Sequence, residues 1–318
     1  LSNVNVTVNA ASQSCMLCVT NSPLLHNWSA VIVASTVNAV SRRLSYLLVV
    51  KGCQEVDHLE VRVHSSSLHG TGDAECRVMG VEGGPDTTGG LHNISFDVQA
   101  NTTIACEKGN RNGDGFSDQA HALYLTARNL PVTYFSAIIA NSVIEMLGET
   151  RYTGSPIGAV ARIDVGAASH IVIAALHSSV TVNGTRSFFG TVDVNAAATD
   201  VVILVASSNV TLDSSFQSSI ALSFSLPQAA AGAVTRFVSR VLVLVVGATF
   251  TVRADIIAYL MCLRGSFSLQ GATLVSLGSS LLYATAPRAL VLSLESSVVP
   301  QLSQSLPNAS EEIQGTGT

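Results

Sequence analysis

The most constraining feature of this sequence is a unit that recurs along the chain at intervals of thirty to forty residues. Each clear copy has a polar residue, a run of mostly β-branched apolar residues, a bend of small residues and a second, shorter apolar run. Three copies align without a gap: His170–Val182, Asp200–Leu212 and Arg240–Val252. Self-similarity at this period is typical of solenoids and propellers. The sequence therefore predicts a stack of equivalent units.

Weaker copies extend the series over most of the chain, beginning at Asn27, His58, His92, Val132 and Arg288. The first apolar residue after each bend marks the register: Val37, Leu68, Ile104, Val143, Val180, Val210, Phe250 and Val298. The intervals between these markers are 31, 36, 39, 37, 30, 40 and 48 residues. The last interval is longer than one repeat, so we expect it to contain additional structure, including a strand within residues 265–270.

The repeated runs have the pattern of β-strands. Apolar and polar residues alternate in Leu59–Val63 and Ile94–Val98, as in a strand with one buried face. Val201–Val205 and Val241–Val246 are apolar throughout and are expected to be central parallel strands. Their outward aliphatic side chains would need a cover, which we expect from the segment Leu226–Phe237 or from a partner.

These patterns predict an all-β fold, a right-handed parallel β-helix of about eight to nine coils with loop excursions. The β-helix is expected over residues 1–299, followed by a polar tail at 300–318 that packs poorly. A propeller is disfavoured because aromatic residues make up only 5% of the chain. Tandem β-sandwiches are the alternative fold, but they do not explain ungapped similarity at a thirty-residue spacing.

The amino-acid composition limits where the chain is expected to function and which partners it is expected to bind. Hydrophobic residues make up 47% of the chain and mean hydropathy is +0.43, yet no run of about 18 uncharged apolar residues is present. Contact with a membrane is therefore expected only through an anchor outside this segment. The net charge of −5 gives no basic surface, so nucleic acid is not an expected partner. The expected partner is a surface ligand, either a glycan or a protein.

Two further signals favour the secretory route and an extracellular, cell-surface location. Six cysteines, an even number, are compatible with disulfides, although their pairing cannot be read from the sequence. The sequence also has N-glycosylation sequons at Asn5, Asn27, Asn93, Asn101, Asn183, Asn209 and Asn308.

No motif in the chain predicts catalysis, a cofactor or a metal. The paired carboxylates of polysaccharide hydrolases are not recognisable, and there is no dinucleotide, phosphate-loop or nucleophile-elbow motif. The segment Asn110–Asp118 resembles a calcium loop, but a His stands at the twelfth position, where a bidentate Glu belongs. A turn is the favoured interpretation. The preferred function is a non-catalytic surface rod for adhesion or display, and the alternative is polysaccharide binding or cleavage.

The register of the three ungapped copies predicts one polar ladder. His170, Asp200 and Arg240 occupy the same place in the repeat. Equivalent positions of a parallel β-helix stack about 4.8 Å apart, so Asp200 is expected to form charge-assisted hydrogen bonds with both neighbours. A structural ladder is favoured here over a metal or catalytic cluster.

The coils of the His170–Val182 type, combined with Asn-Val-Thr sequons such as Asn209, resemble the large β-helical surface proteins of kinetoplastid protists. The dispersed gene family surface proteins of trypanosomes, which have a pectin-lyase-like β-helix, are the nearest in character. The resemblance covers residues 1–299. It implies a long glycosylated ectodomain with a role in adhesion, and it implies no site residues.

Overall fold

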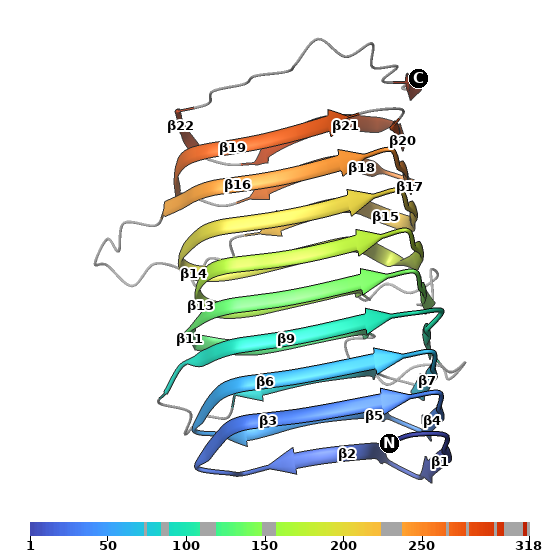
Figure 1. The fold of residues 1–318 in the computed structure, drawn as a ribbon. Coiled ribbons are helices and arrows are strands. Elements are labelled where there is room, and N and C mark those ends of the chain that lie inside the picture. The colour runs from blue at the N-terminus through green and yellow to red at the C-terminus, as the bar shows by residue number, and fades with distance from the viewer. Residues whose placement is uncertain are drawn as a thin grey trace.

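The computed structural model describes residues 1–72, 75–83, 89–108, 119–147, 157–223, 237–264, 267–277, 280–295, 298–301 and 314–316. All regular elements in these ranges are β-strands, and all pairings between them are parallel. The predicted all-β, parallel-strand fold is therefore confirmed, and the antiparallel sandwich alternative is wrong for this part of the chain. Figure 1 shows the strands as a stack of layers that rises from the N-terminus to the C-terminus.

The strands fall into three columns, because the chain returns to the same column after each layer. The first column consists of short strands and the first segments of two long ones: β1 (Asn5–Ala10), β4 (Thr36–Ser41), β7 (Ser67–Gly72), β10 (Thr103–Lys108), β12 (Val143–Leu147), β14 (Ser179–Ala206), β15 (Asn209–Ser223), β17 (Thr249–Ala254), β20 (Leu281–Thr285) and β23 (Gln314–Thr316).

The second and third columns are built in the same way, and long strands pass from one column to the next. The second column contains β2 (Gln13–Thr20), β5 (Leu44–Cys53), β8 (Glu75–Gly83), β11 (Gln119–Ala140), β13 (Ile157–Leu176), β14, β15, β18 (Ile257–Arg264) and β21 (Arg288–Glu295). The third contains β3 (Leu24–Val33), β6 (Glu55–His64), β9 (Leu91–Gln99), later segments of β11, β13 and β14, then β16 (Phe237–Val246), β19 (Phe267–Leu277) and β22 (Val298–Gln301).

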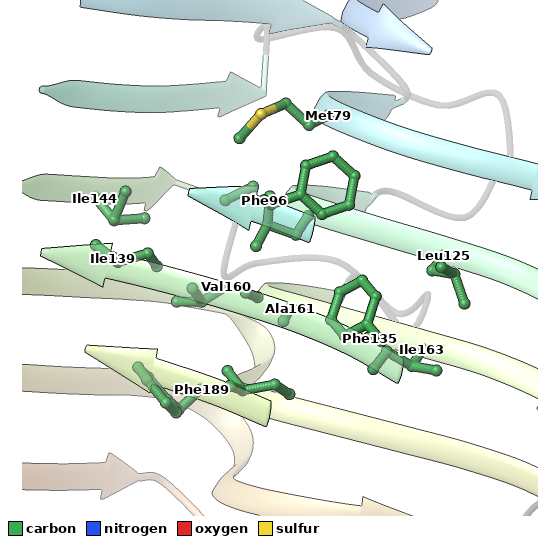
Figure 2. Close-up of a cluster of buried hydrophobic side chains, with 14 of the residues drawn as sticks. Met79, Phe96, Leu125, Phe135, Ile139, Ile144, Val160, Ala161, Ile163 and Phe189 are labelled. Atoms are coloured by element: carbon green, nitrogen blue, oxygen red, sulfur yellow. The ribbon is translucent and has the colours of Figure 1, made fainter. Parts of the chain in front are cut away.

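Alternate side chains of these strands point into one continuous core. Val201, Ile203 and Val205 are buried, whereas Val202 and Leu204 between them are partly exposed, as the period of two predicts. β16 alternates in the same way. Figure 2 shows core side chains of successive layers, among them Phe96 and Phe135, whose ring centroids lie 6.0 Å apart. Burying such a ring stabilises the fold by about 1.5–3 kcal/mol.

A column of buried hydroxyls forms the corner between the third and first columns. Its members are Ser35, Ser66, Thr102, Ser142, Ser178 and Ser208. The Ser178 hydroxyl accepts a hydrogen bond from the backbone N–H of Ser142 in the preceding layer (3.2 Å) and donates one to the Leu176 carbonyl (2.8 Å). The residue before each hydroxyl has positive φ, for example 47° at Ala34 and 49° at Ser65. Gly247, with φ 54°, takes the same place in the next layer, where Ala248 replaces the hydroxyl residue. The chain thus turns at small residues, and the hydroxyls form hydrogen bonds with backbone groups that the turn buries.

The structure corrects two of the register markers. Ile104 pairs with Ile144 rather than with Val143, because Ser142 is the buried corner residue and Val143 takes the outward place after it. The partner of Phe250 is Leu282, since Val298 belongs to β22 in the third column. The long last interval therefore contains a complete further layer.

The cysteines pair as Cys15–Cys18 within β2 and Cys76–Cys106 between β8 and β10. Cys262 is a buried core residue. No helix capable of crossing a membrane occurs in the described part of the chain.

Several sequence predictions lie outside the described residues. These are the turn at Asn110–Asp118, nearly all of the proposed cover Leu226–Phe237, and Asn308. Within the expected polar tail, Gln314–Thr316 forms β23 and pairs with β20.

Candidate functional site

Seven successive layers place a non-glycine residue with positive φ at the same point of the third column. We call these residues the left-handed column; their φ angles lie between 51° and 59°, and they are Asn27, His58, Asn93, Tyr134, His170, Asp200 and Arg240. The pairs on either side of each member keep a constant register between layers. Members of adjacent layers therefore stack on one another.

The left-handed conformation explains much of the residue choice. It costs an L-residue about 1–2 kcal/mol, and Asn, Asp and His are enriched there. Tyr134 and Arg240 are bulky exceptions. Backbone strain of this kind persists where the surrounding structure enforces it, and it is often found at functional surfaces. The column is therefore a candidate functional feature.

The upper part of the left-handed column contains the predicted ladder. The Arg240 guanidinium donates two hydrogen bonds to the Asp200 carboxylate. His170 Nε2 lies 3.6 Å from Oδ2 of the same carboxylate. The hydrogen bond from Arg240 lowers the pKa of Asp200, and the positive charges of Arg240 and His170 add to this effect. The three residues thus lie together as the repeat predicts, but the predicted hydrogen bonds to Asp200 are present only from Arg240, because His170 lies beyond hydrogen-bond distance.

The ladder continues further than the sequence predicted. The ring of Tyr134 stacks on that of His170, with centroids 4.6 Å apart and an interplanar angle of 24°. Tyr134 is 57% exposed. An aromatic ring that is this exposed and held from one side is a suitable contact surface.

The lower part of the left-handed column differs from the prediction. The weaker copies that begin at His58 and His92 predict that these two residues stack, but the neighbour of His58 in the next layer is Asn93, while His92 pairs with Asp57. His92 Nδ1 instead contacts Thr133 Oγ1 at 2.5 Å. At this layer Asn93 takes the left-handed position, with φ 53°, because Asn adopts positive φ readily, and His92 lies one residue before that position.

The same part of the structure brings together three residues that the sequence analysis did not group. Asp57 lies between two imidazoles, with His26 Nδ1 3.1 Å from Oδ2 and His58 Nδ1 2.9 Å from Oδ1. Asn93 Nδ2 donates a hydrogen bond of 2.9 Å to Oδ1. That hydrogen bond lowers the pKa of Asp57, and the two histidines contribute in the same direction. A signal was present, because Asp57 follows His26 by 31 residues, the first repeat interval.

Two adjoining shallow grooves follow the left-handed column on the outer surface. The first is lined by residues of β3, β6 and β9, including Trp28, His58 and Glu60. The second is lined mainly by apolar atoms of β9, β11, β13 and β14, including Tyr134 and Val202. Asn93 and Ser95 line both grooves, so the two form one track across successive layers.

The outward side chains beside this track change from charged to aliphatic along the stack of layers. Early layers present Glu60, Arg62 and Asp97, and the Arg62 guanidinium donates to Glu60 at 2.9 Å through Nε. Later layers present partly exposed aliphatic side chains at Val202 and Leu242. The track therefore runs from a polar end to an apolar end.

The sequons occupy different environments. Four asparagines are exposed: Asn5, Asn27, Asn101 and Asn209. Asn93 is half-buried, and Asn183 is half-buried in β14, where the Thr185 of its sequon is also buried. In the folded chain, four sequon asparagines are thus accessible to modification, whereas Asn93 and Asn183 are partly covered.

A second polar cluster lies on the second column and is buried. Arg77 forms ion pairs with Glu75 and Glu82, and its guanidinium carbon lies 3.7 Å from the ring centroid of Tyr124. The His121 ring stacks on Tyr124, and burial holds the pKa of His121 well below its usual range. The charges of this buried cluster pair with one another, which suits a structural role. Arg77 Nε and His121 Nδ1 have no hydrogen-bond partner among the described residues.

The sequence matches no family model, and no curated protein or solved structure is significantly similar to it.

Proposed function

We propose that this chain is a right-handed parallel β-helix that acts outside the cell as a non-catalytic rod for adhesion or display on a cell surface. The observation that carries the proposal is the groove along the left-handed column, which presents exposed aromatic and polar side chains over successive layers. The surface ligand would be a glycan or a protein.

The β-helix assignment is supported by the strand register. The chain pairs in parallel with its own next layer in all three columns. Connections between parallel strands of one sheet are right-handed in about 98% of cases. With a spacing of about 4.8 Å between layers, eight to nine coils make a rod of roughly 40 Å.

Among surface ligands, the groove favours a glycan. Trp28 and Tyr134 offer apolar ring faces, and Asn93 and Ser95 offer hydrogen-bonding groups between them. Sugars present both an apolar face and a set of hydroxyls, so rings and polar groups in one track suit them. A rigid row of equivalent layers could contact several sugar units of one chain.

Polysaccharide cleavage is the competing function. It needs one carboxylic acid and one free carboxylate about 5–9.5 Å apart. The carboxylates beside the groove among the described residues have other partners: Asp57 contacts His26 and His58, Glu60 binds Arg62, and Asp200 binds Arg240. These contacts favour binding over catalysis.

The extracellular location is supported by the sequons and by the two cysteine pairs. Disulfides persist in oxidising compartments. The resemblance to kinetoplastid surface proteins agrees with this location and remains an expectation from the sequence.

The test is binding of the purified chain to an array of immobilised glycans. We expect Trp28→Ala and Tyr134→Ala to weaken binding of a glycan by roughly 2–10-fold each, since each removes a ring contact. Val40→Ala, which alters an exposed residue of β4 in the first column, should leave binding unchanged. Equal binding by all variants would place the contact surface elsewhere, and release of shortened saccharides would support the enzyme.

A further inference from the structure

The groups around Asp57 form a compact set of metal-binding atoms on the outer surface. One nitrogen of His26, one nitrogen of His58 and a carboxylate oxygen of Asp57 all lie within 4.8 Å of one another. The two imidazole rings meet edge to face, with centroids 5.7 Å apart and an interplanar angle of 76°. Both Nδ1 atoms point at the same carboxylate.

The backbone holds these three side chains together. His26 and Asp57 are partners in the parallel register of β3 and β6. Consecutive residues of a strand normally point to opposite faces, but His58 has φ 56°, which interrupts this alternation directly after Asp57. As a result, Asp57 and His58 project to the same side and touch. The cluster is therefore a consequence of the left-handed column.

The spacing of the donor atoms suits a small divalent cation. Zn²⁺ binds imidazole nitrogen and carboxylate oxygen at about 2.0–2.2 Å in a tetrahedral arrangement, and such bonds separate neighbouring ligand atoms by about 3.3 Å. His26 Nδ1 lies 3.1 Å from Asp57 Oδ2, and His58 Nδ1 lies 2.9 Å from the other carboxylate oxygen, Oδ1. Small side-chain rotations would open enough space for the ion.

Two neighbouring groups favour binding. Asn93 holds the Asp57 carboxylate by a hydrogen bond from Nδ2, as outer-sphere partners commonly hold metal-binding carboxylates. The two histidines are about half exposed, with side-chain exposures of 48% and 55%, so an ion can reach their nitrogens from solvent.

We propose that His26, Asp57 and His58 bind one divalent transition-metal ion, with Zn²⁺ the best match, and that a fourth coordination position remains open. His58 also lines the first groove. The open position can take water or an oxygen atom of a ligand. This inference does not depend on the proposed adhesive function.

The molecule contains a matched control for this site. His170 and Asp200 form a second His–carboxylate pair on the same left-handed column. There the next layer supplies Arg240 in place of a second imidazole, and its guanidinium donates to both carboxylate oxygens. The His170 pair has similar exposure but lacks a chelating set, so it should not hold the ion.

The test measures Zn²⁺ binding to the full chain, after treatment with a chelator and its removal, by competition with a chromogenic chelator. We expect one site that competes at micromolar or lower zinc. His26→Ala, His58→Ala and Asp57→Asn should each weaken binding at least tenfold, whereas His170→Ala should bind as the unaltered chain does. The thermal unfolding midpoint of each variant without metal shows whether it is folded.

Two outcomes would overturn the site. One is an absence of saturable zinc binding in the folded, unaltered chain. The other is binding that His26→Ala and His58→Ala leave unchanged, which would place the ion on other groups such as cysteine thiols. Should Asp57→Asn fail to fold, the two histidine variants, which alter half-exposed side chains, decide the question. Co²⁺ added in place of Zn²⁺ should give the absorption bands of a tetrahedral site, and the His170→Ala variant should retain them.

Discussion

The Asp200 carboxylate accepts two hydrogen bonds from the Arg240 guanidinium, although the two residues are 40 positions apart in the chain. They meet because they occupy the same point in successive layers, between the paired residues Thr199–Ser239 and Val201–Val241. The contact therefore reports directly on how the layers stack.

The first prediction concerns the titration of Asp200. Because Arg240 lowers its pKa in the folded state, this ion pair stabilises the fold above the unfolded-state pKa, and the contribution is lost as pH falls through the folded-state pKa. Arg240→Gln should raise the pKa of Asp200 towards the usual value. His170→Ala should raise it less, because His170 is the weaker influence. Carbon-detected NMR of the carboxylate over an acid titration measures both; an unchanged pKa in Arg240→Gln would refute the stacking.

The second prediction concerns the two disulfides. The Cys76–Cys106 bond closes a separation of 30 residues, and Cys15–Cys18 closes a separation of 3. By the loop-entropy model, replacing Cys76 and Cys106 by Ala should lower the free energy of unfolding by about 3–4 kcal/mol, against roughly 2 kcal/mol for the Cys15 and Cys18 pair. Chemical denaturation of the two double variants gives the comparison, and the reverse order would contradict it.

The third prediction concerns the corner hydroxyls. Ser178→Ala removes the acceptor for the backbone N–H of Ser142 and should cost about 1–3 kcal/mol, because a buried donor is left unsatisfied. Ser179→Ala, at the exposed next position, should cost less than about 0.5 kcal/mol. Denaturant unfolding curves of both variants test this, and equal losses would show that the hydroxyl column contributes little.

The fourth prediction uses two equivalent corners with different residues. Ala34 has φ 47° and Gly247 has φ 54°. Ala34→Gly should stabilise the fold by about 0.5–1 kcal/mol, because glycine adopts this conformation without steric cost. Gly247→Ala should destabilise it by a similar amount, since a Cβ there meets only Ser207 Oγ, at 3.9 Å, and no clash adds to the backbone cost. Thermal unfolding should show shifts of opposite sign; shifts of the same sign would contradict the explanation.

The fifth prediction concerns glycosylation. When the protein is secreted from a eukaryotic host, we expect glycans on the four sequon asparagines with exposed side chains: Asn5, Asn27, Asn101 and Asn209. Asn183 should be largely unmodified, since it is half-buried in β14 beside the buried Thr185. Peptide mass spectrometry gives the occupancy of each asparagine. Full occupancy of Asn183 would mean that modification precedes folding of that layer.

Local pattern in the sequence was sufficient for the strands and for much of the stacking. The alternation in Val201–Val205 predicted which side chains are buried, because the period of a strand is two residues wherever one face meets the core. Gapless copies predicted that His170, Asp200 and Arg240 meet, since equal spacing between the polar residue and the bend leaves no freedom in register.

The predicted register was wrong at positions where backbone conformation, and not residue type, decides which side chain faces the core. Val143 follows a serine, as most of the residues that mark the predicted register follow Ser or Thr. Here, however, the serine is Ser142, the buried corner residue, so the next inward side chain is that of Ile144 and not that of Val143. His92 and Asn93 are both polar, and only their φ angles decide which of them joins the left-handed column. A shift of one residue exchanges the two faces of a strand, so such errors change every predicted contact in that layer.

By itself, then, the sequence determined an all-β chain of parallel, repeating layers, the inward residues of its regular strands and one polar ladder. Only the tertiary structure decided that Asp57 lies between His26 and His58, that Cys76 pairs with Cys106, and that aromatic and polar residues share one groove. These contacts join different layers, whose alignment depends on the number of residues in each corner and excursion and on a few left-handed residues. That alignment is a property of the whole stack, because each layer takes its register from the layer beneath it.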